Sequence, residues 1–116
     1  MIRSDGTPER DYLYVDDAVD AYLAVAESLA EERYRGRAWN AGNDRPIAVR
    51  DVVARVIAAA GSDVEPEIRG EGKPPGEIDR QWLDSTAIRE ELGWQPRWEL
   101  ERGLAETYAW YVQHLV

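Results

Sequence analysis

The segment from Gly6 to Val19 constrains the fold of this 116-residue chain more than any other. It opens with a turn-forming Gly-x-Pro, places Arg10 within an extended aromatic run, and then reaches the paired aspartates Asp16 and Asp17. A short carboxylate at such a position can accept the free backbone N–H groups at the start of a helix. The order therefore predicts an extended stretch that passes into a helix capped by one of the two aspartates.

Apolar residues then recur at helical spacing in four places along the chain. A first helix is predicted from about Val19, and a second after Pro46, ended by Gly61 in a left-handed cap. A third is predicted to begin at Asp84 or Ser85. The apolar residues at helical spacing are Val19, Tyr22, Leu23, Ala26, Leu29 and Ala30; Val49, Val52, Val53, Val56, Ile57 and Ala60; Ala87, Ile88 and Leu92, ended by Gly93; and Leu100, Leu104, Tyr108, Tyr111 and Leu115. In the third set, Ala87, Ile88 and Leu92 are predicted to turn inward.

Short extended segments and turns separate these helices. Residues 38–41 are predicted to form a strand closed by a turn at residues 42–44. Residues 64–68 are predicted to form an edge strand, because Pro66 cannot donate to a central ladder. Residues 69–77 hold three glycines and two prolines and are predicted to be a loop, followed by an extended piece at 81–83.

This pattern predicts an α/β fold that is rich in helix and has a few short strands. The sheet looks too small for a complete doubly wound domain, and no Gly-x-Gly-x-x-Gly follows a strand. Residues 1–116 are therefore expected to form a single domain or a fragment of one, without a dinucleotide phosphate loop.

Charge and composition exclude several classes of function. The net charge of −9 argues against nonspecific binding to nucleic acid or to an anionic membrane. The chain contains no cysteine and a single histidine, His114, which leaves no usual zinc site. No segment has the apolar length of a membrane span or of a signal peptide, so a cytoplasmic location is the expectation.

Arg10 is the strongest candidate for a binding role. A guanidinium presents a planar fork of donors that matches phosphate oxygens two at a time. From spacing alone, a surface arginine paired with Glu9 or Asp11 is the alternative. The series Arg10-Asp11-Tyr12-x-Tyr14-Val15-x-Asp17 resembles the NAD-dependent epimerase/dehydratase family, the extended short-chain dehydrogenases that act on nucleotide sugars. The resemblance implies that Arg10 reaches the diphosphate of the substrate.

Two later segments also resemble this family. Trp39-Asn40-Ala41-Gly42-Asn43 resembles a strand and turn in which an Asn helps to hold the nucleotide phosphate, so Asn43 is a candidate; a turn residue that tolerates positive φ is the alternative. Where many members carry a second diphosphate-binding Arg, this chain has Pro74, with Lys73 beside it. Members resembling CDP-glucose 4,6-dehydratase also lack that Arg and have a Glu near the position of Glu77.

The resemblance implies a C-terminal nucleotide-sugar-binding part of a 4,6-dehydratase or epimerase, closest to CDP-glucose or GDP-mannose 4,6-dehydratase-like members. The implied substrate-binding residues are Arg10, Asn43, Lys73 and Glu77. The family's catalytic Tyr-x-x-x-Lys is absent, because the only lysine is Lys73 and the residue four before it is Arg69. We therefore expect no catalytic residue, no bound cofactor and no turnover from this chain alone, with NAD held only by the full-length family protein.

A non-catalytic interaction or complementing module is the alternative. Such a chain would bury, against the missing NAD-binding domain or another copy of itself, the surface that normally faces that domain. Exposed apolar side chains distinguish this alternative, because large bare apolar patches rarely persist on monomers.

Overall fold

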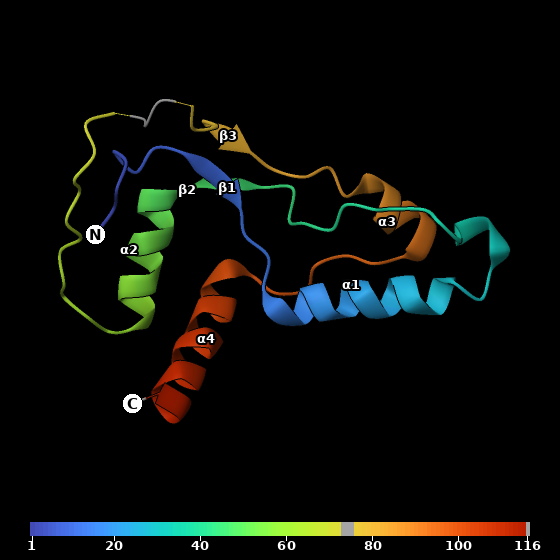
Figure 1. The fold of residues 1–116 in the computed structure, drawn as a ribbon. Helices are drawn as coiled ribbons and strands as arrows, with labels where there is room; N and C mark the ends of the chain where they lie inside the picture. Colours follow the sequence, from blue (N-terminus) through green and yellow to red (C-terminus); the bar gives the residue numbers. More distant parts are fainter. Residues whose placement is uncertain (73–75, 116) are drawn as a thin grey trace.

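The computed structural model describes residues 1–72 and 76–115 and has the predicted helix-rich α/β character (Figure 1). The small sheet lies between two pairs of helices, α1 beside α3 and α2 beside α4. The elements in chain order are β1 (Glu9–Asp11), α1 (Val15–Ser28), the 3₁₀ helix η1 (Glu32–Tyr34), β2 (Pro46–Ala48), α2 (Val49–Ala59), β3 (Arg80–Gln81), α3 (Thr86–Leu92) and α4 (Leu100–Leu115).

The sheet has the strand order β2-β1-β3, with β1 in the centre. Strands β1 and β2 are antiparallel, and Arg10 lies opposite Ile47. Strands β1 and β3 are parallel, and Arg10 lies opposite Gln81. Both neighbours of β1 are remote in sequence, so the strand that carries Arg10 is held from two sides by long-range pairing.

Two of the strands expected from the sequence differ in the structure. Residues 38–41 form no strand, although the pattern predicted one; among the described residues no strand pairs with them. Of residues 64–68, only Ile68 pairs, in an isolated bridge with Ile2. Of the predicted extended piece at 81–83, only Gln81 lies in a strand, β3, which begins at Arg80. Strand-like sequence without a partner leaves an irregular segment, because a strand is stabilised by its neighbours.

The prediction that Asp16 or Asp17 caps the first helix is wrong. Helix α1 begins at Val15 with Tyr14 in the N-cap position, and both aspartates lie inside its first turn. The side chain of Asp17 is fully buried and accepts the backbone N–H groups of Arg97 and Trp98. The carboxylate of Asp17, which the local sequence assigned to a helix cap, therefore accepts hydrogen bonds from a distant segment instead.

The predicted helix ends are confirmed at both glycines. Gly61 and Gly93 have φ values of +58° and +69°, in the left-handed region that favours glycine after a helix. At the start of α3, Ser85 occupies the N-cap position but makes no capping bond, because its Oγ accepts the N–H of Gly42. Asp84 instead accepts the N–H of Thr86 at 3.0 Å.

The hydrophobic core lies between α1, α3 and the segment that follows α3. Ala21, Ile88 and Trp94 form its buried cluster, with Trp39 and Leu92 among the partly buried residues around it. The indole Nε1 of Trp94 donates to the backbone carbonyl of Asp17 at 3.1 Å, so the ring is fixed as well as buried. The buried cluster is therefore small and lies where α1, α3 and this segment meet.

The molecule as a whole is open. Its radius of gyration is 17.1 Å, whereas a compact chain of this length has a value of about 13 Å. Helix α2 contains no buried residue, and Ala87, predicted to turn inward, is exposed. On the apolar stripe of α1, Tyr22 is 80% exposed and Leu23 is 54% exposed. The described chain leaves these two side chains largely uncovered. No helix in the described ranges is long and apolar enough to cross a membrane.

Candidate functional site

Arg10 lies in the central strand and holds a fixed position. Its Nη1 donates to the backbone carbonyls of Glu9 and Ile78, both at 2.8 Å. Its Nη2 pairs with Oε1 of Glu77 at 3.2 Å, and the two side chains are 28% and 35% exposed. The structure thus brings together two of the four candidate residues. Two carbonyls orient the guanidinium, while the arm that carries Nη2 meets a partly exposed carboxylate.

The alternative from the sequence was that Arg10 pairs with Glu9 or Asp11. In the structure, the carboxylates of both residues contact other groups. Glu9 pairs through Oε2 with Nε of Arg80 at 2.6 Å. Asp11 accepts the backbone N–H groups of Asn43, Asp44 and Leu83 at 3.1, 3.0 and 3.4 Å. Alternation along the strand places Arg10 and Asp11 on opposite faces of the sheet. Glu77, remote in sequence, takes the place of these neighbours.

Asn43 lies with Asp11 and apart from the Arg10–Glu77 pair. Its backbone N–H donates to Asp11, and its Nδ2 donates to the carbonyl of Tyr12. The alternative reading of Asn43 as a positive-φ turn residue is wrong, because Asp44 carries the positive φ of 58°. Asp44 also pairs with Arg89 at 2.6 Å. The fourth candidate, Lys73, lies outside the described residues.

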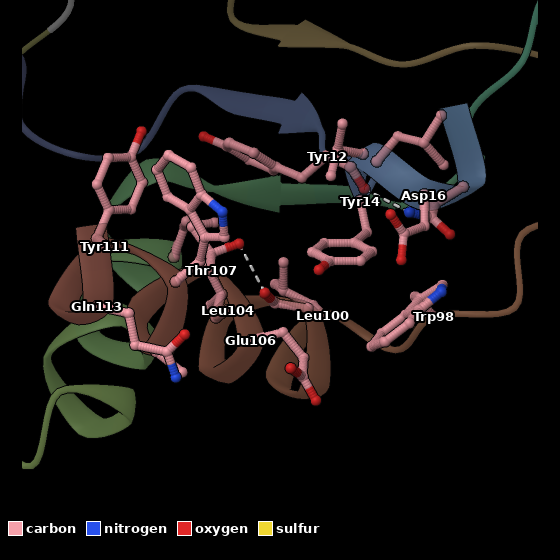
Figure 2. A pocket seen from close by; sticks show the side chains of 17 residues that line it. Tyr12, Tyr14, Asp16, Trp98, Leu100, Leu104, Glu106, Thr107, Tyr111 and Gln113 are labelled. Carbon is pink, nitrogen blue, oxygen red and sulfur yellow. Dashed lines mark hydrogen bonds between the residues drawn. The ribbon is translucent and has the colours of Figure 1, made fainter. Parts of the chain in front are cut away.

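A cavity of about 720 Å³ opens between the segment after β1 and one face of α4 (Figure 2). Asn43 contributes to its lining, whereas Arg10 and Glu77 do not. The sequence candidates are therefore divided between this cavity and the Arg10–Glu77 pair. Sequence reasoning missed the cavity, although the aromatic run after Arg10 supplies one of its walls. The residues labelled in the close view are Tyr12, Tyr14, Asp16, Trp98, Leu100, Leu104, Glu106, Thr107, Tyr111 and Gln113.

Tyr14 and Trp98, which both line this cavity, are in aromatic contact. The rings of Tyr14 and Trp98 lie with centroids 4.4 Å apart, and the guanidinium of Arg102 covers Trp98 at 3.9 Å. Partial desolvation, helped by the carboxylates of Asp16 and Glu106, raises the pKa of the Tyr14 phenol. The phenol therefore stays neutral at physiological pH. Its ring lines the cavity, and its hydroxyl group is the polar end of the side chain.

Three tryptophans in the C-terminal part of the chain differ in their burial. Trp94 is buried in the core and Trp98 is half-buried against Tyr14. Trp110 is 52% exposed; it stacks on His114, with ring centroids 4.4 Å apart, and meets the ring of Tyr111 edge-on at 5.2 Å, both within α4. His114 lies near the end of α4, and its Nδ1 lies 2.8 Å from the backbone carbonyl oxygen of Trp110.

The described residues do not fit a dinucleotide. Strand β2 runs directly into α2 at Val49, with no glycine between Pro46 and Val49. A dinucleotide site of the doubly wound type needs a glycine-rich turn there, so that the pyrophosphate can reach the helix N-terminus. The described ranges also hold no group of three or more metal-ligating side chains.

The family model described as GDP-mannose 4,6 dehydratase matches residues 1–107 of the chain. The chain belongs to the NAD-dependent epimerase/dehydratase family. It is 35% identical over 112 residues to the UDP-glucose 4-epimerase of Mycolicibacterium smegmatis, covering 95% of this chain and 33% of that protein. It is 37% identical over 113 residues to the dTDP-glucose 4,6-dehydratase of Streptomyces griseus, covering 95% and 32%. The chain thus spans about a third of the length of these family members.

Solved structures of the family match the same third. The UDP-glucose 4-epimerase of Thermotoga maritima, solved with UDP-glucose, aligns with a TM-score of 0.80 and 30% identity, covering 99% of this chain and 35% of that one. The dTDP-glucose 4,6-dehydratase of Bacillus anthracis, solved with NAD, aligns with a TM-score of 0.76 and 26% identity, covering 97% and 34%. The open shape of this chain is therefore the shape of one part of a larger family fold.

Proposed function

We propose that this chain is the nucleotide-sugar-binding part of an NAD-dependent sugar-nucleotide epimerase or 4,6-dehydratase, and that it does not turn over substrate alone. The observation that carries the proposal is the setting of Arg10. Two carbonyls hold one side of its guanidinium, and its remaining arm meets only a partly exposed carboxylate. Such an arginine is pre-oriented to bind a diphosphate, which the planar fork of donors suits better than an ammonium would.

Two further facts support this proposal. A family member of similar fold was solved with UDP-glucose, which contains a diphosphate. The chain as a whole carries a net charge of −9, so an anion must be bound by a local arginine and not by a general positive field. Catalysis would need the base and the NAD site, and the sequence supplies neither the family's Tyr-x-x-x-Lys nor its glycine fingerprint.

Calorimetric titration tests the proposal directly. UDP-glucose, dTDP-glucose, GDP-mannose and CDP-glucose are each titrated into the wild-type chain and into Arg10→Ala. At least one nucleotide sugar should bind, and Arg10→Ala should weaken that binding at least tenfold, which corresponds to about 1.4 kcal/mol. The matched control is Arg55→Ala, because Arg55 also pairs with a partly exposed carboxylate, that of Glu101 at 2.6 Å. Equal binding by all three proteins would refute the role of Arg10.

A complementing module is the second candidate function, and the exposed apolar side chains favour it. Tyr22 and Leu23 on α1, and Trp110 and Tyr111 on α4, are each at least 50% exposed. Exposed apolar side chains mark an interface where they form a continuous patch, and each of these helices carries two such neighbours. Under this candidate the chain binds the NAD-binding part of a family protein, or a second copy of itself, and no nucleotide sugar is required.

Light scattering and dye binding separate the two candidates. A complementing module should self-associate or bind a hydrophobic dye, and Tyr22→Ser with Leu23→Ser should reduce the dye signal without loss of helix. The control is Trp82→Ser, because Trp82 is also half-exposed but lies under the guanidinium of Arg80. A monomer with no dye signal would exclude the complementing role and leave the binding role in place.

A further inference from the structure

Two neighbouring side chains of β1 bind the two ends of one segment, and they do so from opposite faces of the sheet. Nη1 of Arg10 donates to the backbone carbonyl of Ile78, two residues before β3, at 2.8 Å. The carboxylate of Asp11 accepts the backbone N–H of Leu83, two residues after β3, at 3.4 Å. Residues 78–83 are therefore fastened to β1 at both ends.

Side-chain packing contributes little to the placement of this segment. Strand β3 consists of Arg80 and Gln81, and both residues are exposed. The ion pair between Arg80 and Glu9 joins the two strands at the surface, where such a pair contributes about 0–1 kcal/mol. A strand is stabilised by the side chains that it packs against its neighbours. The polar contacts at the two ends of residues 78–83 therefore decide where the segment lies.

The carboxylate of Asp11 is itself fixed by the turn at residues 42–44. It accepts the backbone N–H groups of Asn43 and Asp44 at 3.1 and 3.0 Å. Gly42 is buried, and a Cβ at this position would lie 2.5 Å from Oδ2 of Asp11. The turn backbone thus approaches the carboxylate to a distance that leaves no room for a side chain.

The same turn is bound to the start of α3. Asp44 accepts the backbone N–H of Ser85 at 3.0 Å and pairs with Arg89 at 2.6 Å. Oγ of Ser85, which is fully buried, accepts the N–H of Gly42 at 2.8 Å. One residue of α3 also belongs to the buried core. Asp11 therefore connects β1 and residues 78–83 to the packed part of the molecule.

We infer that Asp11 is a positioning residue for the diphosphate contact of Arg10. It acts through the segment it binds, because the position of Leu83 helps to fix the Ile78 carbonyl that orients the guanidinium. Without the carboxylate, the end of the segment after β3 is released, and Arg10 loses part of its fixed orientation. This inference rests on the proposed function, since an arginine that must be ordered during binding gives a lower affinity for a diphosphate.

The test uses Asp11→Asn, which keeps the shape of the side chain and removes one acceptor oxygen. Glu91→Gln is the matched control, because Glu91 accepts from Arg37 at 2.7 Å and from the indole of Trp39 at 2.9 Å, in the part of the molecule around α1 and α3. In the ligand-free protein, Asp11→Asn should lower the NMR order parameter of the Arg10 Nε–Hε group. By calorimetric titration it should weaken UDP-glucose binding about three- to tenfold, the scale of one hydrogen bond. Glu91→Gln should change neither quantity.

Two further measurements do not depend on the folding of Asp11→Asn. In the wild type, the amide hydrogen of Leu83 should exchange with solvent at least about tenfold more slowly than in an unstructured chain, because Asp11 binds it. Gly42→Ala should also lower the Arg10 order parameter, because the added Cβ displaces the carboxylate of Asp11. Alanine suits the backbone at this position, since Gly42 has no positive φ. An unprotected Leu83 amide, or an unchanged order parameter in Gly42→Ala, overturns the inference.

The outcomes also separate this inference from the proposed function. An Arg10 order parameter that does not fall in Asp11→Asn overturns the inference, and so does an equal fall in Glu91→Gln. Unchanged UDP-glucose affinity in Asp11→Asn overturns it as well, and the proposed function stands if Arg10→Ala still weakens binding. If the wild type binds no nucleotide sugar, or Arg10→Ala binds as well as the wild type does, the proposed function fails and the inference fails with it.

Discussion

The fully buried carboxylate of Asp17 accepts the backbone N–H of Trp98 at 3.0 Å, across 81 positions of the chain. Its other oxygen accepts the N–H of Arg97 at 2.9 Å. The first turn of α1 is therefore fastened to the segment that leads into α4. Since β1 passes into α1 within four residues, the same contact also steadies the strand that carries Arg10.

Asp17→Ala should lower the free energy of unfolding by about 2–4 kcal/mol, because two partly buried N–H groups lose their acceptor. Urea denaturation followed by circular dichroism measures the loss. Asp20→Ala is the matched control, since Asp20 pairs only with the exposed side chain of Arg97 and should cost less than about 1 kcal/mol. Equal losses in the two variants would contradict the importance of the buried contact.

Gly103→Ala should destabilise the protein, although alanine favours a helix by about 1 kcal/mol. Gly103 is buried in α4, and a Cβ there would lie 2.9 Å from Cδ2 of the Tyr14 ring. Overpacking of this kind costs about 1–3 kcal/mol. Thermal denaturation should show a lower midpoint for Gly103→Ala. In a Tyr14→Ala background the same change should be neutral or stabilising, and a loss of equal size there would exclude the ring contact as the cause.

Asp84 should contribute to acid sensitivity. The backbone N–H of Thr86, followed by the Thr86 side chain, lowers the pKa of the Asp84 carboxyl. A lowered pKa in the folded state gives stability that is present above the ordinary value of about 3.9 and lost as pH falls through the folded pKa. Asp84→Asn should therefore lose less stability than the wild type between about pH 5 and pH 2. Thermal midpoints across this range measure the effect, and parallel profiles would contradict it.

Epimerase and dehydratase assays with NAD and each nucleotide sugar should show no turnover by the purified chain. The reason is chemical, because hydride transfer needs a bound nicotinamide and a base. The given sequence contains neither the family's Tyr-x-x-x-Lys nor a Gly-x-Gly-x-x-Gly. Addition of the NAD-binding part of a family protein, such as the Mycolicibacterium smegmatis epimerase, tests whether the missing groups can be supplied by another chain. Turnover by the chain alone would contradict the proposed division of roles.

Local signals predicted the helices well where the deciding contacts are themselves local. Gly61 and Gly93 marked helix ends because a left-handed residue after a helix is a property of a few neighbouring residues. Asp17 misled the same reasoning, since its partners Arg97 and Trp98 lie some 80 positions away. In the sequence, a short carboxylate before a helical pattern looks the same whether it caps the helix or accepts hydrogen bonds from a distant segment.

The exposed faces and the missing strand have a common cause. The period of Val19, Tyr22 and Leu23 predicts a helix, and it also predicts a covering surface that the described chain does not contain. Residues 38–41 likewise have strand-like sequence and no partner strand in the described ranges. Both features fit a larger fold, in which other segments would cover the helix and pair with the strand. The chain matches about a third of the length of its relatives.

The binding candidates were predictable only in part. Arg10 and Glu77 were proposed from a resemblance, and their meeting across 67 positions could not be read from spacing. The cavity walled by Tyr14 and Trp98 escaped sequence reasoning, because aromatic residues 84 positions apart give no joint periodic signal. Asn43 was proposed as a phosphate contact, whereas in the structure its side-chain Nδ2 donates a hydrogen bond to the carbonyl of Tyr12.

The most direct measurement is the NMR signal of the Arg10 guanidinium Nε–Hε group, assigned by its loss in Arg10→Lys, during titration with UDP-glucose. The account predicts a saturable shift of the Arg10 signal, with the Arg55 signal unchanged as an internal reference. An Arg10 signal that stays fixed while UDP-glucose, dTDP-glucose, GDP-mannose and CDP-glucose are each added to millimolar concentration would contradict it.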